Sequence, residues 1–286
     1  MSLVTVILIV GLVVLSGLAA TCALCIGRER LSREFESLDE TLLEAFPYLL
    51  GIGLVLMFKG VVHEPSLRLS RSLNWDITEE IYALEGLFVA YVQDLTPDAL
   101  VPVFSGFYMF GFAYLLLAPI LLYLLTSTLR PLKELLVAYS LNYLVGITFY
   151  TLFVAYGPRL HISSHVEGSM YEVFPETQTL TGAVSANTNV FPSLHASLSV
   201  IVLLFAWQTR DRHPRWFAIT SVVATSVVLS TMILGIHWLT DVVAGVALAV
   251  VCVLGAERVV TIIDGEEHSA PFDPDTDGPT STRSDD

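Results

Sequence analysis

Two short segments of the sequence carry side chains that could do nucleophilic chemistry. In HWLTD, His237 and Asp241 are four residues apart, which on a helix places both side chains on one face. A carboxylate in that position can hold one imidazole nitrogen and leave the other free to attack or to accept a proton. The pair could instead be a polar contact that joins helices inside a membrane, and the segment alone leaves both interpretations open.

The segment FPSLH has the features of a helix start that could bind an anion. Pro192 suits the beginning of a helix, Ser193 is a good N-cap residue, and His195 falls within the first turn. The free N–H groups and partial positive charge of a helix N-terminus attract phosphate. Ser193 could equally serve as a cap alone, and His195 could simply face water, although capping and phosphate binding can coexist.

Arg159, in the segment YGPRL, is a third candidate because a guanidinium is always charged and can grip two phosphate oxygens at once. A single arginine beyond a membrane span more often contacts lipid headgroups. Its candidacy depends on its lying at the same depth as the two histidines. His63, His161 and His165 have no comparable partner in the sequence, and we expect them to be loop residues.

The elements that position these residues are predicted to be membrane helices. The chain has 286 residues, of which 54% are hydrophobic and 15% charged, and its mean hydropathy is +0.68. A spanning helix needs about 20 apolar residues, and all spans should be helical because lipid cannot satisfy an open backbone. We therefore expect an all-α polytopic membrane helix bundle of about seven transmembrane helices, with six possible because the second window is short and contains Lys59. The windows are 3–25, 46–62, 103–126, 135–156, 192–207, 216–236 and 239–256.

Basic residues predict the orientation of these spans. They cluster in three predicted loops, at positions 28–33, 130–133 and 210–215. Loops rich in Lys and Arg face the cytoplasm, which places the N-terminus outside and the C-terminal tail inside. His195, His237, Asp241 and Arg159 then meet at the outer rim, as expected for a multi-pass plasma-membrane protein.

The chain divides into three predicted regions: N-terminal spans and an outer segment (1–100), a membrane core (101–262) and an acidic, disordered cytoplasmic tail (263–286). In the outer segment, Ile81, Leu84, Phe88 and Tyr91 follow helical spacing. They predict a helix that either lies on the membrane or caps the bundle, and capping is favoured. Residues 157–191 are expected to form a loop. A net charge of −14 with only two lysines argues against nucleic-acid binding.

With these motifs in view, the sequence resembles the type 2 phosphatidic acid phosphatase superfamily. That superfamily's second and third motifs read PSxH and Hx3D, and here they are residues 192–195 and 237–241. FPSLHAS followed by HWLTDVVAG is most similar to the inositol phosphorylceramide synthase branch, and YGPRL resembles that branch's first motif. The resemblance covers about residues 135–255 and implies a core of the six-helix phosphatase type.

The resemblance also implies roles for the candidate residues. His237 would be the nucleophile that forms a phosphohistidine, Asp241 would orient it, and His195 would protonate the leaving group. Ser193 and Arg159 would bind the phosphate, with no metal and no cofactor. The substrate would be a membrane lipid phosphate or phosphodiester, and the acceptor water or an alcohol such as a polyol.

The sequence departs from the phosphatase branch at one phosphate-binding arginine. That branch begins its third motif with Ser-Arg, whereas here Ser230 is followed by Thr231. The headgroup transferase branch also lacks this arginine. The departure favours transfer without excluding hydrolysis, and the oligomeric state is not predicted.

Two other interpretations use the same residues. A proton-coupled transporter could use the histidines and Asp241 as a relay, but it predicts polar residues at mid-depth and broken helices in matching halves of the chain. A metal-dependent membrane hydrolase could use them as ligands, and it predicts sensitivity to chelators.

Overall fold

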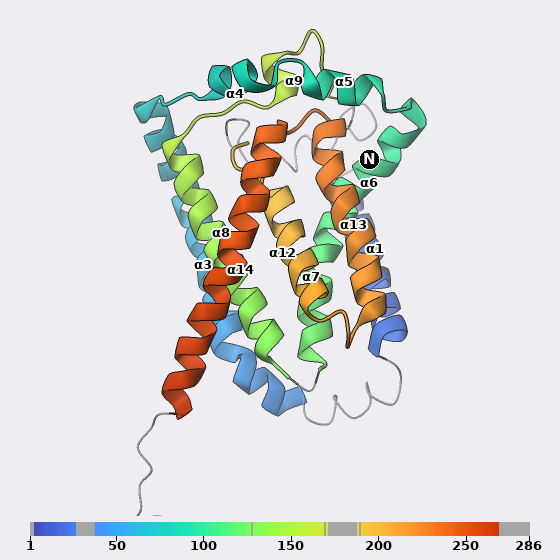
Figure 1. The fold of residues 1–286 in the computed structure, drawn as a ribbon, viewed down its shortest axis with the longest axis vertical. Helices are drawn as coiled ribbons and strands as arrows, with labels where there is room; N and C mark the ends of the chain where they lie inside the picture. The colour runs from blue at the N-terminus through green and yellow to red at the C-terminus, as the bar shows by residue number, and fades with distance from the viewer. Residues whose placement is uncertain are drawn as a thin grey trace, which may run out of the picture.

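The computed structural model describes residues 3–26, 38–126, 128–168, 170, 188 and 190–268, and the part that it describes is an all-helical bundle (Figure 1). The predicted fold class is therefore confirmed. Among the described residues, six helical segments are long and apolar enough to cross a membrane, which agrees with the lower of the two expected numbers. A seventh apolar helix, α12 (Leu194–Gln208), is shorter and lies inside the bundle.

The bundle is built from continuous helical paths. The path at the N-terminus is α1 (Leu3–Thr21) with the π-helical turn η1 (Cys22–Ile26), and the next is α3 (Leu38–Leu73). A third path joins η2 (Asp98–Leu100), α6 (Val101–Gly106), the π-helical turn η3 (Phe107–Gly111) and α7 (Phe112–Leu124). The remaining long helices are α8 (Arg130–Leu152), α13 (Pro214–Ile233) and α14 (Leu239–His268). Three short helices are α4 (Thr78–Glu85), α5 (Phe88–Asp94) and α9 (Pro158–His161).

Helix α12 is the centre of the packing. It contacts α7, α8, α13 and α14, and its side chains Ile201, Val202 and Phe205 are fully buried. By contrast, only 6% of the apolar window of α3 is buried, against 44% for α13. Because an apolar face without a protein partner must be covered by lipid, α3 forms the edge of the bundle.

Helix α3 is longer than the predicted span of residues 46–62. It runs from Leu38 to Leu73 and contains Pro47 and Pro65. His63, expected in a loop, lies within this helix. A hydropathy window measures apolar length rather than helix length, so polar residues that continued the helix lay outside the predicted span.

The helices α4, α5 and α9 lie across one end of the bundle, which we call the cap end (Figure 1). Ile81 and Val89 are buried against Trp238 and other apolar residues beneath them. Of the four residues that predicted this helix, Ile81 is buried as capping requires, whereas Leu84, Phe88 and Tyr91 are exposed, so the predicted apolar face covers the bundle only in part. The expected single helix is interrupted at Gly86, where φ is +58°, a backbone conformation that glycine adopts readily.

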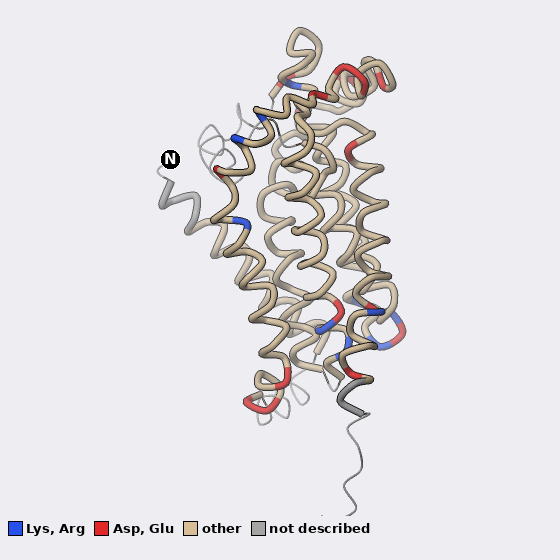
Figure 2. Tube along the Cα trace, turned by 90° about the vertical axis from the view of Figure 1, so that its left-hand side faces the viewer, with Lys and Arg blue, Asp and Glu red and all other residues tan. Residues whose placement is uncertain are grey.

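The opposite end, where α14 finishes, is called the tail end. Charged residues gather mainly at these two ends of the bundle (Figure 2). The helix α14 continues past residue 263, where the tail was predicted to begin, and Asp264 within it contacts Lys133. The rest of the predicted tail, and most of the predicted loop 157–191, lie outside the described residues.

Candidate active site

The turn between α13 and α14 positions His237. Helix α13 ends before Gly235, whose φ of +65° lets the chain reverse where a side chain would collide with Val166 and Glu167. The backbone N–H of His237 donates to the carbonyl of Thr231 at 3.0 Å. The imidazole is thereby fixed at the cap end and is only 4% exposed.

Asp241 lies in the first turn of α14 and faces His237, as the spacing predicted. Its Oδ2 is 3.3 Å from Nδ1 of His237 and also accepts the backbone N–H of Trp238 at 2.8 Å. The carboxylate is fully buried. Since a carboxylate accepts hydrogen bonds, this contact favours the tautomer with the proton on Nδ1 and a lone pair on Nε2, and the imidazole also has a hydrogen bond to the backbone of Val190.

The start of α12 lies directly against the start of α14. Ser193 is the N-cap residue of α12, and its Oγ accepts the N–H of Ala196 at 3.3 Å. Its own N–H donates to the carbonyl of Asp241 at 3.0 Å. Gly245 permits this approach, because a Cβ there would lie 2.5 Å from the carbonyl oxygen of Ser193. The predicted cap is confirmed, and the hydroxyl proton of Ser193 can still be donated.

His195 belongs to the same cluster but is held by aromatic rings. Its ring centroid is 6.2 Å from that of His237. It stacks on Tyr108 at 4.3 Å with an interplanar angle of 20°, and Phe112 lies at 4.3 Å on a tilted plane. Tyr108 belongs to the π-helical turn η3 and Phe112 directly follows it. This irregular turn therefore supplies part of the wall of the site. Such turns are frequent at functional sites.

Arg159 reaches the same end of the bundle from the short helix α9. Its backbone N–H donates to the carbonyl of Gly235 at 3.0 Å, which joins α9 to the turn that carries His237. Burial, and next the positive charge of Arg159, lower the pKa of His237 from its usual value to about 3. The imidazole is therefore neutral at physiological pH, as a nucleophile must be.

Several residues at the site were not predicted from the sequence. His161 was expected to be a loop residue, yet its ring lies 6.1 Å from Trp238 and 5.3 Å from Tyr82. Glu85 of α4 accepts hydrogen bonds from two backbone N–H groups at the start of α14. No sequence pattern could have identified His161 and Glu85, because their contacts form only when the cap folds over the bundle and brings distant segments together.

Thr231, at the position where the phosphatase branch carries an arginine, is fully buried. Its Oγ1 donates to the carbonyl of Val228 at 2.7 Å. It supports His237 through its carbonyl oxygen, and it adds no positive charge to the site. Among the described residues, no three His, Cys, Asp or Glu side chains are grouped as a metal site would require, and the interpretation as a metal hydrolase gains no support from the geometry.

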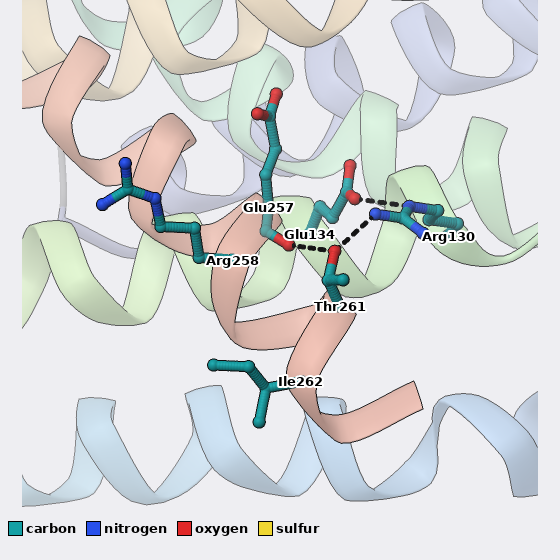
Figure 3. Close-up of a pocket in the computed structure, with 6 residues that line it drawn as sticks. All are labelled: Arg130, Glu134, Glu257, Arg258, Thr261 and Ile262. Carbon is teal, nitrogen blue, oxygen red and sulfur yellow. Dashed lines mark hydrogen bonds and ion pairs between the residues drawn. The ribbon is translucent and has the colours of Figure 1, made fainter. Parts of the chain in front are cut away.

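A pocket at the tail end that is lined by four charged residues, Thr261 and Ile262 offers a contrast (Figure 3). It has a volume of about 650 Å³ and lies between α8 and α14. Arg130 points toward Glu134, with 2.7 Å between Nε and Oε1, and also donates to Thr261 at 2.8 Å. An arginine whose donors are already bound to a carboxylate and a hydroxyl is suited to joining helices.

Fold and site together define a class of protein: an all-α integral membrane protein with a histidine–aspartate pair and a second histidine at one rim. The PAP2 superfamily matches residues 89–255, which is more than half of the chain, and the chain belongs to that superfamily. Membership supports a function of the phosphatase or phosphotransferase type. No curated protein and no solved structure matches the chain significantly.

Proposed function

We propose that the chain transfers phosphoryl groups from a membrane lipid phosphate or phosphodiester through a phosphohistidine on His237. The observation that carries this proposal is the contact between His237 Nδ1 and Asp241 Oδ2, with His195 opposite. It supports a nucleophile whose tautomer is fixed by a carboxylate and which has a second histidine nearby. Superfamily membership supports the same type of reaction.

The proposed reaction has two displacements at phosphorus. In the first, Nε2 of His237 forms the bond to phosphorus, the bond to the leaving oxygen breaks, and that oxygen takes a proton from His195. In the second, the oxygen of water or of an alcohol forms the bond to phosphorus, the bond to Nε2 of His237 breaks, and the attacking oxygen gives its proton to His195. Asp241 keeps the proton on Nδ1 and stabilises the charge that develops on the imidazole. Arg159 and Ser193 are proposed to bind the phosphate oxygens.

We favour an alcohol acceptor at least as strongly as water. Thr231 leaves the site without the arginine of the phosphatase branch, and the inositol phosphorylceramide synthase branch shares this feature. A site that positions a hydroxyl near the phosphohistidine raises the effective concentration of that hydroxyl over water. A polyol such as inositol or glycerol is the proposed acceptor.

We also propose that the cap end faces outside. The basic residues Arg130, Arg210 and Arg215 lie in or beside the loops of the tail end, and basic loops face the cytoplasm. Single cysteines placed at Ser164 and at Asp211 would test this in intact cells. A membrane-impermeant thiol reagent should label the first and spare the second, and the reverse pattern would refute the orientation.

The reaction is tested with purified protein in liposomes that contain labelled lipid phosphates and phosphodiesters, with EDTA present. Transfer or release should fall at least about 10³-fold in His237→Ala, because the nucleophile is lost. The matched control is His165→Ala, which removes a cap-end histidine that contacts Ser164 instead of this cluster. Full activity in both His237→Ala and His195→Ala would refute the proposed roles, as would movement of solute by a protein that transfers no phosphate.

Adding inositol or glycerol distinguishes an alcohol acceptor from water. A transferase should convert a labelled lipid phosphate into inositol or glycerol phosphate at the expense of free phosphate, and a labelled phosphodiester into a new phosphodiester at the expense of the phosphomonoester. Release of phosphate that no alcohol reduces would assign hydrolysis instead. The leaving-group role of His195 has its own test: His195→Ala should lose much less activity on a p-nitrophenyl ester, whose leaving group needs no proton.

A further inference from the structure

Glu85, the last residue of α4, contacts the segment that lies between His237 and Asp241. Its Oε2 accepts the backbone N–H of Leu239 at 2.9 Å, and its Oε1 accepts the N–H of Thr240. The first N–H groups of a helix have no partner within the helix. One carboxylate therefore satisfies two consecutive N–H groups in the first turn of α14.

The position of Glu85 is unfavourable for its own helix. Glu85 ends α4, and a negative charge at a helix C-terminus opposes the helix dipole. The same charge is favourable at the N-terminus of α14. Gly86, with its positive φ, ends α4 at this residue and turns the chain into α5. The placement of the carboxylate is thus explained by α14 and not by α4.

A second residue of α4 contacts the same segment. The ring of Tyr82, one turn before Glu85, lies 6.1 Å from that of Trp238. Trp238 is fully buried and its indole N–H donates to the carbonyl of Tyr156 at 2.8 Å. Helix α4 therefore contacts three consecutive residues, Trp238, Leu239 and Thr240, which connect the proposed nucleophile to the carboxylate that orients it.

We propose that Glu85 is a positioning residue that holds the first turn of α14 so that Asp241 keeps its contact with His237. Glu85 lies outside the residues matched by the superfamily, so it links the N-terminal third of this chain to the site. This inference rests on the proposed function for its kinetic part, whereas the contact itself can be tested without any activity.

The kinetic test compares Glu85→Gln with Glu80→Gln, which removes the same charge from an exposed position on the same helix. Glu85 does not touch the substrate in this proposal, so KM should stay within about twofold while kcat falls about 10- to 100-fold. Glu80→Gln should keep both values. An unchanged kcat in Glu85→Gln would overturn the positioning role, and so would a Glu85→Gln protein that fails to fold, since the role would then be structural.

The structural test measures amide hydrogen exchange in a peptide that covers residues 237–242. Exchange should rise in Glu85→Gln, because an amide has one acceptor oxygen in place of two and one of the N–H groups of Leu239 and Thr240 loses its acceptor. Exchange should stay unchanged in Glu80→Gln and in peptides from α12. Unchanged exchange in Glu85→Gln would overturn the contact. If the wild-type protein transfers no phosphate, the proposed function fails, and the exchange experiment still decides whether Glu85 holds this turn.

Discussion

The two ends of the bundle use polar side chains in different ways. At the tail end, Lys133 lies 3.0 Å from Glu44 and 3.3 Å from Asp264, and these contacts join α8 to α3 and α14. At the cap end, His195 is stacked on Tyr108 and His237 is buried beside Asp241. One end is held by pairs of opposite charge, and the other combines imidazoles with aromatic rings.

This difference separates polar groups that join helices from polar groups that are available for chemistry. In an ion pair the charges of the two partners neutralise each other. A neutral imidazole whose one nitrogen is hydrogen-bonded keeps a lone pair on its other nitrogen. The pocket in Figure 3 is roomy, yet Arg130 within it is already bound to Glu134. The volume of a pocket is therefore no guide to whether its polar groups are available for chemistry.

The largest expected effect is on kcat, and it compares the buried carboxylate of the cap end, Asp241, with that of the tail end, Glu134. Asp241→Asn should lower kcat by about 10²- to 10⁴-fold, because an amide can hold the imidazole in the wrong tautomer. Glu134→Gln at the tail end should keep kcat within about twofold. Steady-state rates on the liposome substrate provide the measurement, and equal losses in the two variants would remove the proposed distinction between the ends.

A second prediction concerns the charge of Arg159 and the pH dependence of the reaction. Arg159 is the second cause of the low pKa of His237, so Arg159→Gln should raise that pKa. In the proposed reaction the neutral imidazole is the nucleophile, so activity should be present above this pKa and lost below it. The acid limb of kcat/KM should therefore move to higher pH, with a loss of about 10- to 10³-fold at the optimum.

Lys133→Gln is the control, because it removes a positive charge at the tail end. Its acid limb should coincide with that of the wild type. An acid limb that stays in place in Arg159→Gln would show that Arg159 does not act on His237.

A third prediction tests the close approach of α12 and α14. In Gly245→Ala the new Cβ would collide with the backbone of Ser193, so we expect a loss of about 1–3 kcal/mol in the free energy of unfolding and reduced activity. Gly51→Ala on α3 has open space around the new Cβ and should gain up to about 1 kcal/mol. Thermal unfolding in detergent measures both, and equal stability would mean that this contact is not tight.

The smallest effect is expected for the ion pair between Lys133 and Glu44. A double-mutant cycle should give a coupling below about 1 kcal/mol, because the Glu44 side chain is 58% exposed and solvent screens the pair. Added salt should reduce the coupling, and phosphoryl transfer should be unaffected. A coupling of several kcal/mol would place a strong electrostatic determinant at the tail end.

Local features of the site could be predicted from the sequence, because they depend on neighbouring residues. The spacing of His237 and Asp241 and the N-cap role of Ser193 are properties of a few residues at a helix start. The contact of Glu85 with Leu239 joins positions 154 residues apart, and no local pattern encodes it. The length of α3 was also missed, because its two ends are helical but too polar to fall within an apolar window.

The length of α3 has a consequence for the cap. Its 36 residues correspond to about 54 Å at 1.5 Å per residue, whereas a hydrocarbon core is about 30 Å thick. The helix leads into α4 through a tight turn at Asn74, where φ is +48°. A thinner or thicker bilayer changes the tilt of such a helix, and the strain would pass to the segment that ends in Glu85. We therefore expect lipid chain length to act on the geometry around His237 from outside the site.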